Sequence, residues 1–226
     1  MDLKEALAQL EAAGTEQNRK TYRNHGVKGD QFGVSFAALD KIAKQIRRDP
    51  NLAAALWATG NHDARLLATR IADPELLSSA DLDAWSRDLG NYIASDALSA
   101  LVARSPWARE KMEAWTADDD EWRGAAGWNI LASLAMNDST LPDDYFRPYL
   151  EVIRSDIHNR KNRVRYSMNN ALIAIGLRSP ALRQEAIEAA KEVGPVEVDH
   201  LKTNCKTPEA VSYIDRAWDR REKRAT

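Results

Sequence analysis

The segment Phe36–Ile46, with the sequence FAALDKIAKQI, decides the fold class. Its apolar residues recur at positions i, i+3, i+4 and i+7, and they are Leu39, Ile42, Ala43 and Ile46. This is the period of an amphipathic helix with one buried face, and the lysines between the apolar positions fall on the other face. Ser35, directly before the segment, is the residue type that caps a helix N-terminus. The segment therefore predicts a helix that begins after Ser35.

The same helical period occurs along the rest of the chain, in residues 125–135, 171–176 and 186–190. No stretch of about six residues alternates convincingly between polar and apolar residues, as a half-buried strand would. The sequence therefore predicts an all-α protein. Gly26, Gly29 and Gly33 lack the strand–turn–helix context of a phosphate-binding loop, so we interpret them as a turn before the Ser35 helix.

The predicted helices form pairs. Pairs are expected to begin near Ser35, Ser79, Glu121 and Asn162, about 40 residues apart, which is the spacing of HEAT and armadillo repeats. Stacked pairs of this kind make an α-solenoid, or α–α superhelix, with a concave surface. An irregular helical bundle is the competing architecture. We expect one domain over residues 1–226, with residues 195–226 as a C-terminal extension, and terminal helices within residues 1–14 and 216–226.

The composition excludes several classes of protein. The 226 residues are 44% hydrophobic and carry a net charge of −2, which excludes intrinsic disorder. No run of about eighteen apolar residues occurs, so no membrane span is predicted. The first residues lack the basic start and apolar run of a secretory leader, and Cys205 has no second cysteine to pair with. We therefore expect a cytoplasmic protein.

Charge is unevenly distributed along the chain. Residues 73–121 carry twelve Asp or Glu against four Arg or Lys, whereas residues 151–175 carry five basic residues against two acidic ones. The densest basic run contains Arg160, Lys161, Arg163 and Arg165. Basic helix termini contact nucleic-acid phosphates, so these residues are candidate DNA contacts, with a solvated helix start as the alternative. Lys28 is a weaker candidate for the same role.

An ordered set of short segments carries a resemblance to a known family. The segments are DQFGV at 30–34, LDKIAK at 39–44, LW at 56–57, DARLLA at 63–68 and LGNYIASD at 89–96. In this order they resemble the HEAT-like-repeat DNA alkylation repair proteins, the AlkD-like DNA glycosylases, over roughly residues 20–176. The stretch 198–208 is similar to the tails of one branch of these proteins. The resemblance implies a protein that binds alkylated double-stranded DNA in the concave groove and excises cationic N3- or N7-alkylpurines. We also expect the protein to be a monomer.

The resemblance also implies roles for two residues. Asp96 falls where the family has its catalytic carboxylate, which stabilises the positive charge that develops on the sugar. Tyr92, one helical turn earlier, falls where the family usually has a tryptophan that contacts the cationic nucleotide through its ring face. A helix-start carboxylate is the alternative interpretation of Asp96, and a half-buried helix residue is the alternative for Tyr92.

Two further positions depart from the family pattern. The expected arginine falls on Gly124 or Ala125, and Arg123, a residue or two away, is the nearest basic side chain and a candidate DNA contact. The expected second tryptophan falls on Asn169 or Asn170. These departures and the near-neutral net charge keep a second hypothesis open, in which the protein is a non-catalytic HEAT-like scaffold that binds DNA structure or a protein partner.

Asp199, His200 and Cys205 carry ligand-type atoms, but no second close pair completes a metal site, so neither a metal nor a cofactor is predicted. A metal-dependent hydrolase built on His200 and Cys205 is a third, weaker alternative.

Several of the seven tryptophans lie among apolar helix positions and are predicted to pack in the core. They are Trp57, Trp85, Trp107, Trp115, Trp122 and Trp128.

Overall fold

The computed structural model describes residues 1–225, and these residues are helical apart from turns, extended connections and an isolated bridge between Gly14 and Val34. The all-α prediction is thus confirmed for the described chain. The α-helices within it are α1 (Leu3–Ala13), α2 (Glu16–Asn24), α3 (Phe36–Ile46), α4 (Pro50–Ala58), α5 (His62–Ile71), α6 (Ser79–Arg87), α7 (Tyr92–Val102), α8 (Ala108–Thr116), α9 (Glu121–Asn137), α10 (Arg147–Asp156), α11 (Asn162–Gly176), α12 (Pro180–Val193) and α13 (Ala210–Ala225). Two short 3₁₀ helices are η1 (Asp143–Tyr145) and η2 (Ile157–Asn159).

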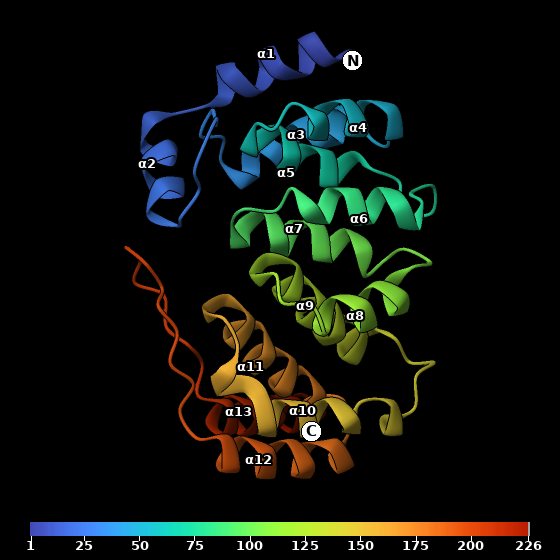
Figure 1. Ribbon diagram of the computed structural model, residues 1–226, viewed down its shortest axis with the longest axis vertical. Helices are drawn as coiled ribbons and strands as arrows, with labels where there is room; N and C mark the ends of the chain where they lie inside the picture. The colour runs from blue at the N-terminus through green and yellow to red at the C-terminus, as the bar shows by residue number, and fades with distance from the viewer. Residues whose placement is uncertain (226) are drawn as a thin grey trace. The chain divides into compact units, whose positions relative to one another are not determined.

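The chain divides into two compact units, each of which stacks its own helices (Figure 1). Unit 1 comprises Met1–Lys111 and His200–Asn204, and unit 2 comprises Met112–Asp199 and Cys205–Thr226. The boundary falls within α8. A single domain with a C-terminal extension from residue 195 stays a prediction.

The four predicted pair starts agree with the structure. Ser35 caps α3 by accepting a hydrogen bond from the Ala38 backbone N at 3.3 Å. Helices α6, α9 and α11 begin at Ser79, Glu121 and Asn162, as expected. The last helix differs, because α13 begins at Ala210 rather than near residue 216. The Glu209 carboxylate accepts from two backbone amides of the first turn, at 3.0 and 2.8 Å, and so starts this helix earlier.

The core of unit 1 is built around α5, which packs against α3, α4 and α7. Trp57 of α4 and Trp85 of α6 are both buried and stack with parallel rings 4.4 Å apart. The prediction of core tryptophans is confirmed for this pair and for Trp115 and Trp128, while Trp107 and Trp122 are half-buried. Aromatic stacking thus joins two successive helix pairs within the unit.

A buried carboxylate fixes the turn before α3. Asp63 of α5 has no exposed surface, and it accepts hydrogen bonds from the backbone amides of Phe32, Gly33 and Val34 at 2.6, 3.1 and 2.8 Å. Gly33 has φ +78°, and a Cβ there would lie 2.5 Å from the Thr15 carbonyl oxygen, so only glycine fits. The glycine-containing segment is therefore a turn, as predicted.

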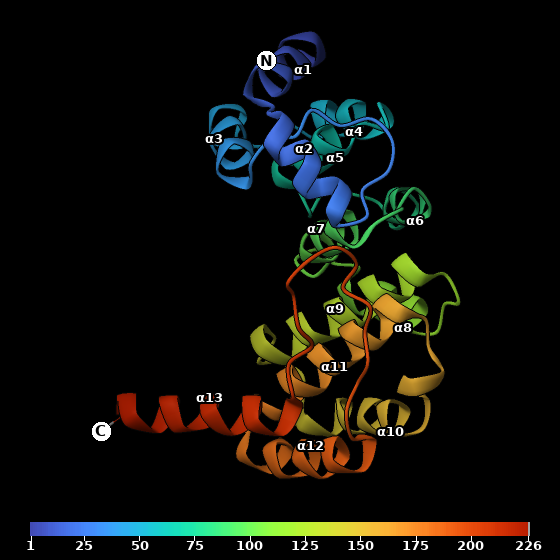
Figure 2. The ribbon, with the colours of Figure 1, turned by 90° about the vertical axis from the view of Figure 1, so that its left-hand side faces the viewer.

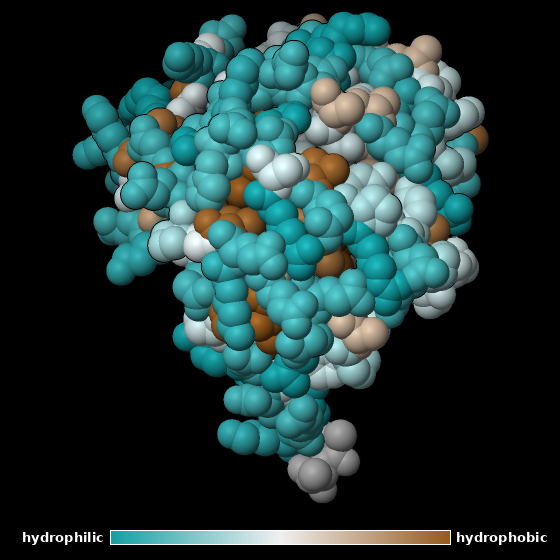
Figure 3. Space-filling view, turned by 60° about the horizontal axis from the view of Figure 1, so that its bottom comes forward, coloured by the Kyte–Doolittle hydropathy of each residue, from teal (hydrophilic) through white to brown (hydrophobic). Residues whose placement is uncertain are grey.

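Unit 2 is centred on the packing of α9 against α11. Gly127 allows α9 to approach the end of α8 closely, since a Cβ at this position would lie only 2.4 Å from the Thr116 backbone N. Helix α13 packs on α11 and α12 through the fully buried Ile214, and Trp218 donates from Nε1 to the Gly176 carbonyl at 2.8 Å. Residues 219–223 of α13 are exposed and charged, and this part of the helix projects from unit 2 with a hydrophilic surface (Figures 2 and 3).

Within residues 1–225 no helix combines the length and the apolar character that crossing a membrane requires.

Candidate functional site

Helix α7 of unit 1 presents both residues that the resemblance assigns to chemistry. Asn91 caps this helix by accepting from the Ala94 backbone N at 3.0 Å, so Tyr92 is its first residue. Asp96 follows one turn later on the same side, and both side chains are half-buried. Because Asp96 lies beyond the first turn, the helix-start interpretation does not account for it.

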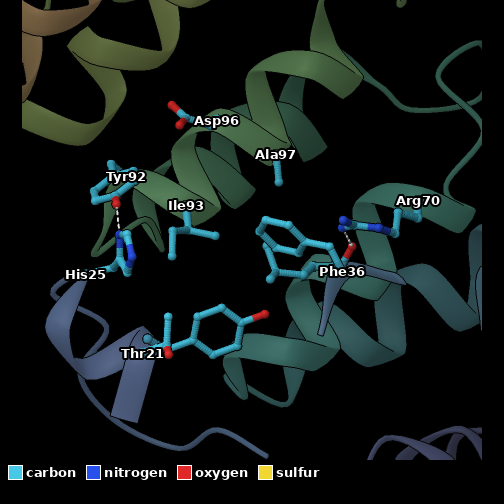
Figure 4. Close-up of a pocket in the computed structure, with 10 residues that line it drawn as sticks. Thr21, His25, Phe36, Arg70, Tyr92, Ile93, Asp96 and Ala97 are labelled. Atoms are coloured by element: carbon cyan, nitrogen blue, oxygen red, sulfur yellow. Dashed lines mark hydrogen bonds between the residues drawn. The ribbon is translucent and has the colours of Figure 1, made fainter. Parts of the chain in front are cut away.

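Tyr92 and Asp96 border a pocket of about 350 Å³ in unit 1 (Figure 4). Its other lining residues come from α2, α3, α5 and α7 or directly follow α2, and they are Thr21, Tyr22, His25, Phe36, Leu66, Arg70, Ile93 and Ala97. Figure 4 shows Ile93 and Ala97 pointing from α7 toward Phe36, with Asp96 at the margin. The helix that carries the assigned carboxylate therefore also forms one wall of a largely apolar cavity.

At one end of the pocket, the Tyr92 hydroxyl is hydrogen-bonded to Nδ1 of His25. The two rings meet edge to face with centroids 5.8 Å apart. Burial lowers the pKa of His25 below its ordinary value, which favours the neutral imidazole at neutral pH. This hydrogen bond with His25, the residue directly after α2, fixes the orientation of the Tyr92 ring.

The opposite end of the pocket is aromatic and cationic. Phe36, the first residue of α3, is 50% exposed, and the Arg70 guanidinium lies 5.4 Å from its ring centroid. Arg70 is held by Asp40, at 2.9 Å, and by the Leu66 carbonyl, at 2.8 Å. The arginine is thereby fixed beside one part of the Phe36 ring.

The floor of the pocket contains Tyr22, whose hydroxyl donates to the Val34 carbonyl at 2.5 Å. Burial raises the pKa of Tyr22 to about 12, and the charge of Asp63 acts in the same direction. Tyr22 is therefore a neutral, structural side chain that supports Phe36, whose ring centroid is 6.4 Å away.

Sequence reasoning did not identify Phe36, His25 or Arg70 as site residues. Phe36 continues the apolar stripe of Leu39 and Ala43, so periodicity alone gives no reason to expect it at the surface. The one signal in the sequence that Phe36 could be exposed was its place as the first residue of the helix. At a helix end, an apolar residue can lie beyond the neighbouring helix that buries the rest of the apolar face. His25 and Arg70 reach the pocket only through the packing of α2 and α5.

The predicted basic run lies at the start of α11 in unit 2, and its members differ in their contacts and in their exposure to solvent. Arg160 donates to the carbonyls of Thr116 and Asp118 at 3.2 and 2.9 Å and pairs with Asp156 at 3.3 Å. These contacts favour a structural role for Arg160. Lys161 is exposed, so its ammonium group lies at the surface of unit 2.

The remaining candidate cations are also distributed over both units. Arg163 is half-buried with its guanidinium 4.1 Å from the ring centroid of Tyr166, and Arg165 is half-buried. Arg123 forms an ion pair with Asp118 at 3.3 Å. Lys28 is exposed in the turn after α2. A DNA contact by any of these residues stays a prediction.

The positions that depart from the family pattern are packed within unit 2. A Cβ at Gly124 would lie 3.1 Å from the Asp118 carbonyl oxygen and 3.2 Å from Cγ2 of Val164, and Ala125 is fully buried. Asn169 is 3% exposed and donates to the Pro208 carbonyl at 3.0 Å, so it ties α11 to the segment before α13. Gly124, Ala125 and Asn169 are thus used for packing, whereas Asn170, the other position on which the expected tryptophan could fall, is half-buried.

Among the described residues, no three His, Cys, Asp or Glu side chains gather into a group that could hold a metal ion.

Comparison with known proteins agrees with this architecture. Residues 6–214 match the family model described as DNA alkylation repair enzyme. Two uncharacterized proteins, from Listeria innocua and Listeria monocytogenes, are 29% and 28% identical to this chain over 219 residues, which is 94% of this chain and 95% of each of them.

A solved structure matches with a TM-score of 0.90 and 34% identity, over 97% of this chain and 95% of that chain. It belongs to a family of proteins related to the HEAT-like repeat DNA glycosylases with affinity for branched DNA structures. The match confirms the predicted HEAT-like repeat α-solenoid over an irregular bundle. The chain belongs to the DNA alkylation repair enzyme family.

Proposed function

We propose that the protein binds branched DNA structures and does not excise bases from them. The observation that carries this proposal is the packing of the positions where the resemblance implies an arginine and a second tryptophan. A Cβ at Gly124 would lie 3.1 Å from the Asp118 carbonyl oxygen and 3.2 Å from Val164, so a longer side chain requires these neighbours to move, and Asn169 is buried and bonded to the Pro208 carbonyl. The affinity of the solved relative for branched DNA structures supports the same function here.

The physical basis of binding is contact between exposed cations and phosphates. Lys28 in unit 1 and Lys161 in unit 2 are exposed, and unit 1 also carries the exposed Lys20 on α2. A net charge of −2 adds no overall attraction, so affinity must come from such local contacts. We therefore expect the affinity to fall steeply with salt, by about 0.9 in log K per unit of log salt for each phosphate contacted.

Fluorescence anisotropy tests this function. A four-way junction, a three-way junction and a linear duplex of equal length are titrated with the protein over a salt series. We expect tighter binding to the two branched DNAs, with a linear decrease of log affinity with log salt. Equal affinity for the linear duplex, or no affinity for any of the three, contradicts the proposal.

Base excision is a second candidate function, favoured by one observation. Asp96 and Tyr92 both lie on one side of α7 and border the same pocket, as an anion and an aromatic ring beside a cationic nucleotide would. Incubation with duplex DNA that contains 7-methylguanine tests it, with Asp96→Asn as the control. Base release by the wild type that Asp96→Asn abolishes, with unchanged DNA affinity, would establish excision and overturn the non-excising proposal.

The expectation of a cytoplasmic monomer is part of this proposal. Cys205 is exposed at the surface, where a reducing compartment would keep its thiol unmodified. Light scattering of the purified protein tests the monomer, and fractionation of the host cell tests the location.

A further inference from the structure

We infer that the pocket bordered by α2, α3, α5 and α7 receives an unpaired nucleobase of branched DNA, which stacks on the ring of Phe36. The inference rests on the DNA binding proposed above and names the part of the DNA that unit 1 would recognise.

The first argument is the character of the pocket. Its volume of about 350 Å³ lies at the lower end of the range for sites that hold small organic groups. Its inner surface is mostly apolar, and Phe36 is 50% exposed at its opening. An exposed phenylalanine beside an apolar hollow gains free energy when a flat apolar surface covers it.

The second argument is the rigidity of the aromatic surface. Tyr22 lies beneath Phe36 and is fixed by its hydrogen bond to the Val34 carbonyl. Arg70 stays near the Phe36 ring because Asp40 and the Leu66 carbonyl hold its guanidinium. A flat ligand therefore meets a surface that is already ordered, so little side-chain entropy is lost on binding.

The third argument is charge, which distinguishes a nucleotide from an uncharged apolar ligand. Thr21, Tyr22 and His25 form the side of the pocket that belongs to the segment 16–28. Outside the pocket lining the same segment carries four basic residues, of which Arg19 and Arg23 pair with Glu16, while Lys20 and Lys28 are exposed. A base is always followed by its phosphates along the strand, so two exposed lysines on the segment that lines an aromatic hollow match both parts of a nucleotide.

The fourth argument explains why the base is unpaired. A base within a duplex has both faces covered by its neighbours, and its extrusion costs free energy. This cost is least for a base that is already unpaired, as at an incompletely paired branch point. Stacking on an aromatic side chain tolerates every base because each has a π face. The pocket would then favour branched DNA that has an unpaired base, without reading its sequence.

The experiment uses the full chain and two branched DNAs that differ at one place. One carries 2-aminopurine as an unpaired base at the branch point, and the other is fully paired. With the wild type, we expect binding of the first DNA to change the 2-aminopurine fluorescence. Phe36→Ala should abolish that change and weaken binding of this DNA by roughly 5- to 100-fold, while its affinity for the fully paired branched DNA is unchanged.

Three further variants keep the test independent of folding. Phe36→Trp retains an aromatic face and should retain the fluorescence change. Ala97→Leu leaves Phe36 intact but enlarges a side chain that points into the pocket, so it should weaken binding of the unpaired-base DNA only. Leu76→Ala alters another exposed apolar residue, 70% exposed and outside the pocket, and should behave as the wild type.

Two results overturn the inference in distinguishable ways. If the wild type binds both branched DNAs but Phe36→Ala and Ala97→Leu leave fluorescence and affinity unchanged, the pocket does not hold the base, and the proposed function still stands. If the wild type binds neither branched DNA, the proposed function fails, and the inference fails with it.

Discussion

Helix α7 in unit 1 and helix α9 in unit 2 both carry positions that the resemblance assigns to the family's site, but the side chains at these positions differ in exposure. On α7, Tyr92 and Asp96 remain half-exposed at a pocket. On α9, Gly124 and Ala125 are buried, and the helix packs closely on α11. Two helices of the same repeat architecture can therefore serve different purposes. Helix α7 presents polar side chains at a pocket, whereas α9 has small residues at the corresponding positions and uses them to pack against its neighbours.

The two helices also differ in what holds their surroundings in place. In unit 1, polar contacts to buried groups such as Asp63 and Tyr22 fix the turn and the helix beside the pocket. In unit 2, close backbone approach at Gly127 and Gly124 fixes α9. Four predictions follow from this difference, in order of decreasing effect.

The largest effect is expected from Asp63→Ala. The substitution leaves three backbone amides of the turn without an acceptor, two of them buried and one half-buried, and should lower the free energy of unfolding by about 3–5 kcal/mol. Urea denaturation measures this loss. Asp40→Ala, which removes an exposed carboxylate, is the control and should cost less than about 1 kcal/mol. Equal losses for the two variants would show that the unit 1 turn does not depend on Asp63.

The next effect is expected from Gly127→Ala on α9. The added Cβ would lie 2.4 Å from the Thr116 backbone N and 2.6 Å from the Trp115 carbonyl carbon, so backbone must move, at a cost of about 1–3 kcal/mol. Gly124→Ala is the matched control on the same helix. Its nearest contacts are 3.1 and 3.2 Å, so its cost should be smaller.

Gly124→Arg extends this test to function. If packing closes the position, the variant should be less stable than Gly124→Ala and should not gain base release from 7-methylguanine DNA. A stable variant that releases the base would show that α9 can still present the arginine, and the contrast between α7 and α9 would then disappear.

The third prediction concerns pH and the histidines of unit 1. Burial lowers the pKa of His62 to about 4, and burial also lowers the pKa of His25. In the unfolded chain these groups bind protons below about pH 6.5, so the unfolded state binds more protons than the folded state between about pH 4 and 6.5. Stability should therefore rise with pH across this range and fall on acidification.

His62 alone should account for about 2 kcal/mol between pH 7 and pH 5, at 1.36 kcal/mol per pKa unit. Urea denaturation at the two pH values measures this change. His62→Phe keeps an aromatic ring against Tyr22, whose centroid lies 4.9 Å from that of His62, and should reduce the pH dependence. An unchanged pH dependence in this variant would assign the effect to other groups.

The smallest effects are expected from single exposed lysines. Lys28→Ala in unit 1 and Lys161→Ala in unit 2 should each weaken DNA binding a few-fold, equally for all sequences, and reduce the salt slope by about 1. Anisotropy with the same junctions measures both. If only one of the two variants changes the slope, only that unit contacts phosphate through the tested residue.

The sequence predicted the helix starts well because capping and apolar period are local. Ser35 before the stripe of Leu39 and Ile42 was sufficient to place α3. The start of α13 was placed too late, because the capping group is Glu209, a residue type that is not among the preferred caps. Trp107 and Trp122 are half-buried, although the sequence predicted them to be in the core. Their exposure depends on how distant helices pack against them, which the apolar residues next to them in the sequence do not reveal.

The candidate site was predicted in part. Asp96 and Tyr92 were placed on one side of a helix by their spacing, and that placement is correct. Phe36, His25 and Arg70 were missed because they belong to three different segments that only packing brings to one pocket. A phosphate contact by Arg160 stays a prediction, and only the structure shows that its guanidinium donates to the carbonyl oxygens of Thr116 and Asp118.

The sequence by itself determined the helices, their pairing at about 40-residue spacing and the family, since these depend on local period and on the order of short motifs. Only the tertiary structure decided which side chains line the pocket and which positions on α9 and α11 are closed. Solvent exposure is a property of the neighbours that pack against a residue, and those neighbours are far away in the sequence.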